Sequence, residues 1–152
     1  KIKSQVLGGA ISKIDWKGSF LLWLTSLFYR VLPYIFIYNL AALVILPKKT
    51  HRSSRKLFVK EAKKLNQQEF NKWFRMLYHS NAIIAELKRL KGIVPTLFIM
   101  GNQDYFFLKE VQKHLKSNQN QQLSVIPSCG HVVNFEKPTV FNEISLEFIQ
   151  NH

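Results

Sequence analysis

Cysteine is nearly absent from this sequence of 152 residues, and its scarcity excludes two kinds of stabilisation. Cys129 alone cannot close an internal disulfide, and its neighbours do not have the ligand spacing of a metal site. We therefore expect no metal, no other cofactor, and a reducing, cytoplasmic compartment. A secretory signal is also missing, because residues 1–6 lead into no cleavable hydrophobic segment. The first residue is Lys1 rather than Met, which is compatible with a start inside a longer polypeptide.

Acidic residues are scarce as well: nine Asp and Glu stand against 22 Lys and Arg, for a formal net charge of +13. Such an excess suits nucleic acid, an anionic membrane surface, or simply a solvated helix face. No nucleic-acid-binding motif accompanies it, so we expect no nucleic-acid partner and keep an anionic membrane surface as a candidate. Eight basic residues gather in one segment whose single acid is Glu61: Lys48, Lys49, Arg52, Arg55, Lys56, Lys60, Lys63 and Lys64.

Apolar residues, in contrast, are plentiful. They make up 47% of the chain and aromatic residues make up 13%, which excludes a disordered protein. The length fits one domain with a real hydrophobic core, and no internal repeat is present.

The longest apolar stretch runs from Phe20 to Leu46, with Arg30 as its single formal charge. It is long enough to span a bilayer, and basic residues follow it. Arg30, Pro33 and Asn39 interrupt it, however, and its aromatic residues are spread out instead of gathered at the two ends. We favour two apolar helices that line a pocket, 16–32 with Asp15 as its cap and 34–46, and keep a transmembrane segment as the alternative.

Three further helices are expected before residue 93. The helix that comes first in the chain begins at a Ser53 or Ser54 cap and reaches about Leu65. The helix that comes last spans 82–90 and ends at Gly92. The second, 67–78, carries an apolar stripe of Phe70, Trp73, Phe74 and Leu77 at helical spacing. Such a stripe indicates core or pocket wall rather than a cofactor site.

The remainder of the chain alternates strands with helices. The apolar run 94–100 is typical of a strand buried on both faces of a parallel sheet. Alternation with crossover helices predicts an α/β fold with about three parallel strands and right-handed connections. The expected elements are a strand within 5–10, the strand 94–100, a helix over 106–115, a polar loop over 117–121, a strand over 123–126 and a helix over 138–149.

Two of these strands end at a turn that holds one titratable residue. The segment VPTLFIMGNQD ends at Asp104, and LSVIPSCGH ends at His131. Because parallel strands end at the same edge of a sheet, this arrangement suits a paired acid and imidazole. Each residue taken alone also fits a plain turn or loop position.

These segments resemble the C-terminal half of an α/β-hydrolase. PTLFIMGNQD is similar to the family's strand with the acid turn, and VLGGA near the start resembles an earlier strand. The separation of 27 residues between Asp104 and His131 (131 − 104) also suits the family. The family's pattern around the catalytic histidine is met by Gly130, His131, Glu136, Pro138, Phe141, Ile144, Phe148 and Ile149.

The resemblance implies a division of the chain and roles for the two residues. Residues 1–13 and 92–152 would belong to the hydrolase core, and 14–91 would form a helical cap. Asp104 would orient His131, which would act as general base and then as general acid on a hydrophobic ester or related carbonyl substrate. Cys129 is disfavoured as a nucleophile, because it leaves the same loop as His131. Tyr105, Phe106 and Phe107 fit either the pocket wall or the core.

The family's nucleophile motif, G-x-S-x-G, is absent. None of the six glycines is followed two positions later by serine. In the family, the nucleophile elbow that carries this motif precedes the strand that VLGGA resembles. The resemblance therefore implies that the chain is a C-terminal portion whose partner is the missing N-terminal half of the fold. The chain alone is then predicted to be inactive, and its first strand to have an unpaired edge.

Two other hypotheses remain. In one, the chain is a catalytically inactive hydrolase-like module that binds lipid or a protein partner through its apolar and basic cap region. In the other, it is an integral membrane protein anchored by residues 20–46.

Overall fold

The structure, a computed structural model, describes residues 2–81, 94–115 and 120–152. The chain divides into two compact units, each taken by itself below. The sheet unit comprises Lys1–Lys13 and Glu86–His152, and the helical unit comprises Ile14–Ala85.

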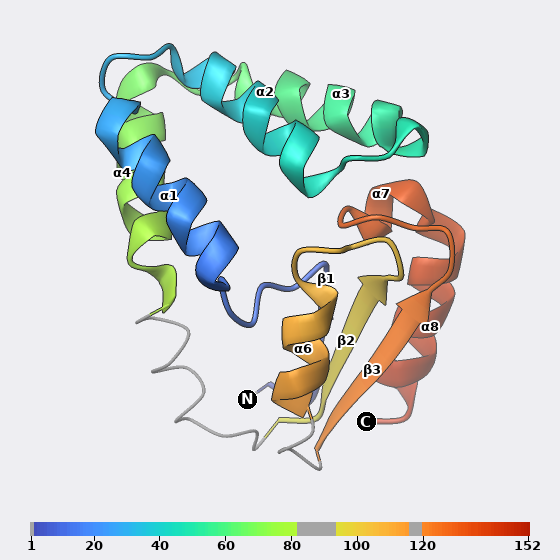
Figure 1. Cartoon of the computed structure of the whole chain (residues 1–152). Helices are drawn as coiled ribbons and strands as arrows, with labels where there is room; N and C mark the ends of the chain where they lie inside the picture. Colours follow the sequence, from blue (N-terminus) through green and yellow to red (C-terminus); the bar gives the residue numbers. More distant parts are fainter. Residues whose placement is uncertain (1, 82–93, 116–119) are drawn as a thin grey trace. The chain divides into compact units, whose positions relative to one another are not determined.

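The sheet unit is built on three parallel strands in the order β1-β2-β3 (Figure 1). They are β1 (Gln5–Gly8), β2 (Thr96–Gly101) and β3 (Gln121–Ile126). Every residue of β2 is buried, as its continuous apolar run predicts. The predicted α/β class with three parallel strands is confirmed.

Helices cover both faces of this sheet. Leu97 and Ile99 on one face of β2 share a core with Phe148 of α8 (Pro138–Gln150). Side chains alternate along a strand, so Phe98 lies on the opposite face, where its ring contacts His114 of α6 (Leu108–Leu115). A short helix, α7 (Val133–Glu136), precedes α8 and was not expected from the sequence.

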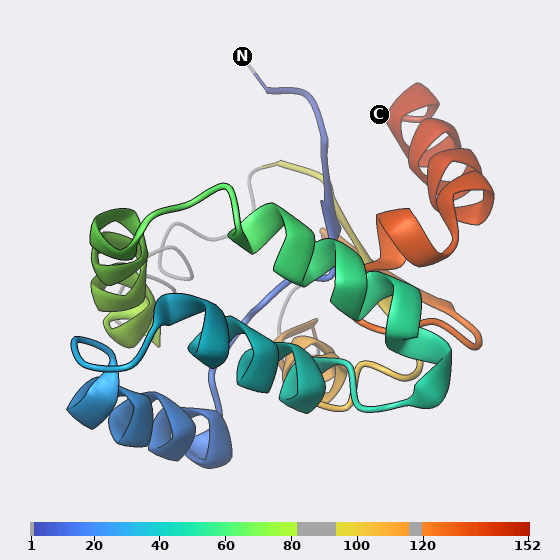
Figure 2. The ribbon, with the colours of Figure 1, turned by 90° about the horizontal axis from the view of Figure 1, so that it is seen from above.

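The helical unit contains four α-helices and one 3₁₀ turn within its described residues. Two begin with a side-chain cap: the Asp15 carboxylate accepts from the Gly18 N–H at 2.8 Å, and Asn66 caps through the Glu69 N–H at 2.9 Å. Helices α2 and α3 lie side by side (Figures 1 and 2). The elements are α1 (Trp16–Phe28), α2 (Tyr34–Ile45), η1 (Lys49–His51), α3 (Arg52–Ala62) and α4 (Gln67–Tyr78).

Aromatic packing and a few long-range hydrogen bonds hold this unit together. Tyr29, Phe70 and Phe74 form its buried cluster, and the rings of Tyr29 and Phe74 stack at 4.8 Å. The predicted stripe of α4 is therefore partly core: Phe70 and Phe74 are buried, whereas Trp73 and Leu77 are exposed. Where the chain enters and leaves the unit, the Asn81 amide donates to the Ile14 carbonyl and accepts from the Ile14 N–H.

Several predicted boundaries were wrong. Neither Ser53 nor Ser54 caps α3. The 3₁₀ turn η1 leads directly into this helix, so His51 occupies the N-cap position, and its side chain makes no capping hydrogen bond. Helix α1 ends at Phe28, four residues before its predicted end (32 − 28), and α6 begins at Leu108 rather than at Phe106. The helix predicted over 82–90, its Gly92 end and most of the loop over 117–121 lie outside the described residues.

Within the described ranges, no helix combines the length and the apolar composition that crossing a bilayer requires. The apolar stretch 20–46 is divided between α1 and α2, as the favoured interpretation had it. The cytoplasmic location stays a prediction.

Candidate active site

The acid turn that follows β2 is tied to the loop after β3 by backbone hydrogen bonds. Asn102 donates to the Ile126 carbonyl at 2.9 Å, and Gln103 donates to the Cys129 carbonyl at 2.8 Å. These bonds fix the position of the next residue, Asp104, relative to the loop that carries His131.

Asp104 is buried, with 1% of its surface exposed. One carboxylate oxygen, Oδ1, accepts from the Phe107 N–H at 3.1 Å, and the Asp104 carbonyl accepts from the Leu108 N–H at 3.2 Å. A buried carboxylate needs such partners, because losing water around a charge is costly. Phe107, the residue before α6, thereby holds one oxygen and leaves the other, Oδ2, directed at His131.

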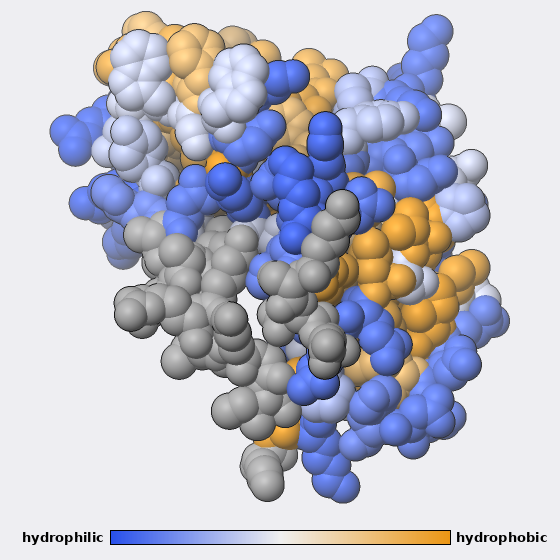
Figure 3. Space-filling view, turned by 60° about the horizontal axis from the view of Figure 1, so that its bottom comes forward, coloured by the Kyte–Doolittle hydropathy of each residue, from blue (hydrophilic) through white to orange (hydrophobic). Residues whose placement is uncertain are grey.

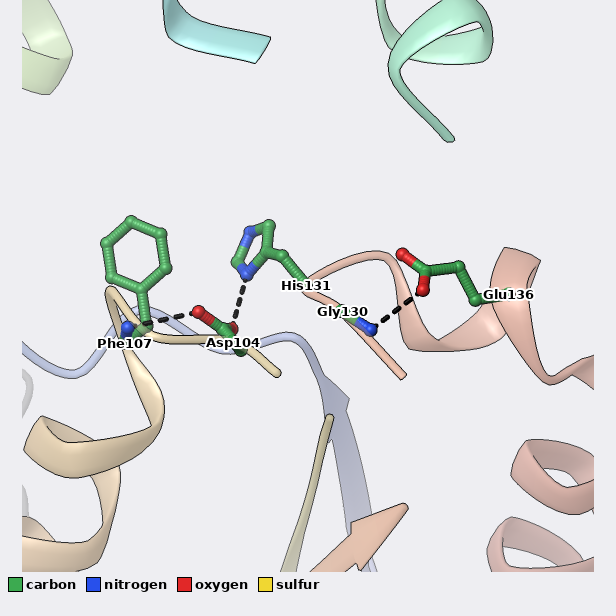
Figure 4. A network of polar contacts seen from close by, with 5 residues as sticks. All are labelled: Asp104, Phe107, Gly130, His131 and Glu136. Carbon is green, nitrogen blue, oxygen red and sulfur yellow. Dashed lines mark hydrogen bonds and ion pairs between the residues drawn. The ribbon is translucent and has the colours of Figure 1, made fainter. Parts of the chain in front are cut away.

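His131 receives that second oxygen. Its Nδ1 lies 2.7 Å from Asp104 Oδ2, so Nδ1–H donates to the carboxylate (Figure 4). In the neutral ring this bond places the lone pair on Nε2, the nitrogen turned away from Asp104. Within the described part of the chain Nε2 has no hydrogen-bond partner, and the His131 side chain is 19% exposed. The imidazole is therefore oriented and able to accept a proton at Nε2.

The loop that carries His131 is braced from its far side. The Glu136 carboxylate, on α7, accepts from the Gly130 N–H through Oε2 at 2.7 Å (Figure 4). A charged acceptor makes a stronger hydrogen bond than a neutral one. Glu136 thus closes the loop immediately before the imidazole and fixes where the ring leaves the backbone.

Close backbone approach at two strand ends requires glycine. A Cβ on Gly101, at the end of β2, would lie 2.2 Å from the carbonyl oxygens of Cys129 and Gly130. Gly9, after β1, has a φ of +58°, and a Cβ there would lie 2.3 Å from the His131 carbonyl oxygen. The His131 loop therefore rests directly on the ends of both strands.

Phe107 forms the other side of the imidazole. Its ring centroid lies 4.9 Å from that of His131, and the side chain is buried. This contact limits rotation of the imidazole. Of the three aromatic residues after the acid, Phe107 is thus core and site wall together, Phe106 is half-buried, and Tyr105 is 59% exposed.

Cys129 belongs to the core of the sheet unit. It is fully buried beside Ile126 and Val133. Burial, followed by the negative charges of Glu136 and Asp104, raises the pKa of its thiol to about 11, although Lys137 opposes the shift. A thiol of this kind stays protonated at neutral pH and is a poor nucleophile. Among the described residues, His, Cys, Asp and Glu side chains form no group of three able to hold a metal ion.

No protein-family model matches this chain, and no curated protein matches it either. Among solved structures it is similar to MGS-M2, described as an alpha/beta hydrolase enzyme from a Medee basin deep-sea metagenome library. The superposition has a TM-score of 0.60 at 24% sequence identity, and it covers 98% of this chain. The chain has part of the α/β-hydrolase fold.

The structural similarity to MGS-M2 supports the sequence resemblance to α/β-hydrolases as far as the fold is concerned. The chain spans 56% of the length of the MGS-M2 chain. Asp104 and His131, predicted to meet, do lie within hydrogen-bonding distance, while their catalytic role stays a prediction. The sequence pattern around His131 includes Glu136 but does not indicate its contact with Gly130, and the pair Gly8 and Gly9 predicts a turn but not the contact with the His131 loop. The adjacent glycines at the end of β1, Gly8 and Gly9, were the available signal for the close approach at Gly9.

Proposed function

We propose that this chain is the C-terminal portion of a serine hydrolase of α/β-hydrolase type that cleaves a hydrophobic ester or a related carbonyl compound. One observation carries the proposal: a buried carboxylate, Asp104, bonds Nδ1 of His131 at 2.7 Å. The α/β-hydrolase fold supports it, because the pair follows two neighbouring parallel strands at the same end of the sheet.

The roles follow from this hydrogen bond. Asp104 keeps the neutral ring protonated at Nδ1 and stabilises the imidazolium that forms during reaction. His131 Nε2 takes the proton from a serine hydroxyl as the serine oxygen bonds to the substrate carbonyl carbon. It then gives the proton to the alkoxide that leaves when the ester C–O bond breaks. A water molecule, activated by the same nitrogen, releases the acid and restores the serine.

The serine of this proposal lies outside the 152 residues, since no G-x-S-x-G occurs in them. Cys129 does not replace it, because its thiol is buried and its pKa is raised to about 11. We assign the helical unit as the cap of this hydrolase. The apolar and aromatic content of the cap segment favours a hydrophobic substrate.

The codons that precede Lys1 in the gene give the first test. A G-x-S-x-G encoded there, ahead of the strand that VLGGA forms, supports the proposal. An encoded protein without a serine elbow contradicts it. The full encoded protein should then hydrolyse p-nitrophenyl butyrate, and His131→Ala should abolish turnover, whereas Cys129→Ala should retain it.

The 152 residues alone give the second test. They should release p-nitrophenol no faster than their own His131→Ala variant does. Turnover that is lost in His131→Ala would show that a nucleophile is present within the chain and would overturn the assignment of an external serine. ¹⁵N NMR of the neutral His131 ring tests the geometry independently, since it should show Nδ1 protonated and Nε2 unprotonated.

A further inference from the structure

Two parallel stripes of opposite chemistry lie along the α2–α3 helix pair. On α2, four exposed apolar residues recur at helical spacing, among them Leu40 and Leu43, which are 49% and 55% exposed. On α3 and the residue that ends it, four basic residues recur at the same spacing. The apolar stripe is Phe36, Leu40, Leu43 and Val44, and the basic stripe is Arg52, Lys56, Lys60 and Lys63.

The basic stripe and one residue of the apolar stripe, Leu43, line a groove of about 470 Å³ between the helices. Its apolar lining comes from Ala42 and Leu43 of α2 and Val59 of α3. All four residues of the basic stripe line it too, together with Arg55 and Asn39. The groove is therefore lined mainly by basic side chains, and the rest of the apolar stripe lies on the exposed surface of α2 outside it.

The acidic residue of α3 does not neutralise the basic stripe. Glu61, the acid of α3, pairs with Lys64 instead. Arg55 donates its guanidinium to the carbonyls of Leu46 and Lys48, and so ties the end of α2 to α3. Within the described part of the chain, none of the four stripe residues forms an ion pair with a carboxylate. Four like charges side by side disfavour one another, so an anionic surface would stabilise them.

Helix α1 adds a second exposed apolar face to the same unit. It includes two tryptophans, a residue type enriched where membranes meet water. Figure 3 shows hydrophobic residues (orange) in two areas of one face of the molecule, at the upper left and at the right of the view. The exposed residues of this face are Trp16, Phe20, Trp23, Leu24 and Leu27.

We propose that the α2–α3 pair docks on an anionic lipid bilayer, with the basic stripe on the head groups and the apolar stripe of α2 in the outer acyl region. Charge complementarity selects this occupant. A second copy of the chain would bring the same cations together, and nucleic acid would leave the apolar stripe in water. Basic residues beside an apolar helix face are the features of helices that lie in the membrane interface.

Vesicle binding tests this proposal without reference to hydrolysis. The protein should co-sediment with vesicles of equal parts phosphatidylcholine and phosphatidylglycerol, and hardly at all with phosphatidylcholine alone. Rising NaCl should weaken the binding, since salt screens the head-group charges. Co-sedimentation that is equal on both vesicle types, or absent from both, would overturn the proposal.

The basic stripe is tested by the triple variant Lys56→Gln, Lys60→Gln and Lys63→Gln. Loss of three head-group contacts should lower the vesicle partition coefficient by roughly 100-fold. The matched control, Lys13→Gln, Lys72→Gln and Lys109→Gln, removes the same charge from exposed lysines elsewhere and should lower it less than about tenfold. Equal losses in the two triples would show that net charge alone drives binding.

The apolar stripe is tested by Leu40→Ser combined with Leu43→Ser. Because both side chains are about half exposed, the variant should keep the melting temperature and lose about tenfold in vesicle affinity. Unchanged vesicle affinity would overturn the insertion of α2. Light scattering with and without vesicles identifies self-association, and competition by inorganic phosphate identifies a site for a free anion; either result would overturn membrane docking.

Discussion

Apolar segments are buried in the sheet unit and largely exposed in the helical unit. Strand β2 of the sheet unit buries every residue, whereas α2 of the helical unit, an equally apolar segment, buries only Ala42. The sheet unit thus uses its apolar residues for a core that fixes Asp104 and His131, and the helical unit presents many of its own to the outside. Apolar composition shows that burial of a segment is favourable. It does not show whether the segment is buried by the rest of the protein or by a partner.

Substitution within the Asp104–His131 pair should have the largest effect of the changes compared here, and the effect should be on activity. In the full encoded protein, Asp104→Asn should lower kcat/KM for p-nitrophenyl butyrate by about 10⁴-fold, because an amide favours the wrong tautomer of His131. The loss should be in kcat more than in KM, since the pair acts on the transition state.

Glu143→Gln on α8 removes an exposed carboxylate that forms no ion pair with His131 and gives the matched control. It should leave kcat/KM within about twofold. An Asp104→Asn protein that keeps its activity would remove the catalytic role of the carboxylate.

Burial itself is compared by two truncations. Ile99→Ala in β2 should lower the free energy of unfolding by about 3 kcal/mol, because the side chain is fully buried in the core of the sheet unit. Leu43→Ala in α2 should change it by less than about 0.5 kcal/mol, because that side chain is 55% exposed. Urea denaturation followed by circular dichroism measures both, and similar losses in the two variants would show that α2 is covered in solution.

The core of the sheet unit also carries a pH-sensitive group. The pKa of Cys129 is raised to about 11 in the folded protein from an ordinary value of 9.0. The unfolded chain therefore loses the thiol proton first as pH rises, and the contribution to stability, complete below pH 9, is lost between about pH 9 and 11. The loss should amount to about 3 kcal/mol and should be absent in Cys129→Ala. Alkaline unfolding that is identical in both proteins would contradict the raised pKa.

The sequence predicted the sheet unit better than the helical unit, for a physical reason. The continuous apolar run of β2 predicted a buried strand, and the turns after β2 and β3 place Asp104 and His131 at neighbouring strand ends, 2.7 Å apart. In the helical unit, Ser54 looked like a cap and is buried inside α3, because the turn η1 supplied the start instead. The exposed face of α2 was not predictable, because the sequence of one helix does not show which of its residues the neighbouring helices cover.

The hydrogen bond between Glu136 and Gly130 could not be predicted from the sequence pattern, although the pattern includes both residues. Its loss should have the smallest effect on activity and stability among these predictions, control variants aside. Glu136→Gln keeps the shape of the side chain and an amide oxygen that still accepts from the Gly130 N–H, but removes the charge. It should lower the free energy of unfolding by about 1 kcal/mol and lower kcat/KM by about tenfold, because the loop that aims His131 loosens. Glu136→Ala, which leaves the buried Gly130 N–H without its acceptor, should cost more in both quantities. A fall in stability with unchanged kcat/KM would reduce Glu136 to a structural brace, whereas larger losses in Ala than in Gln, in both measurements, would establish it as a residue that positions the imidazole.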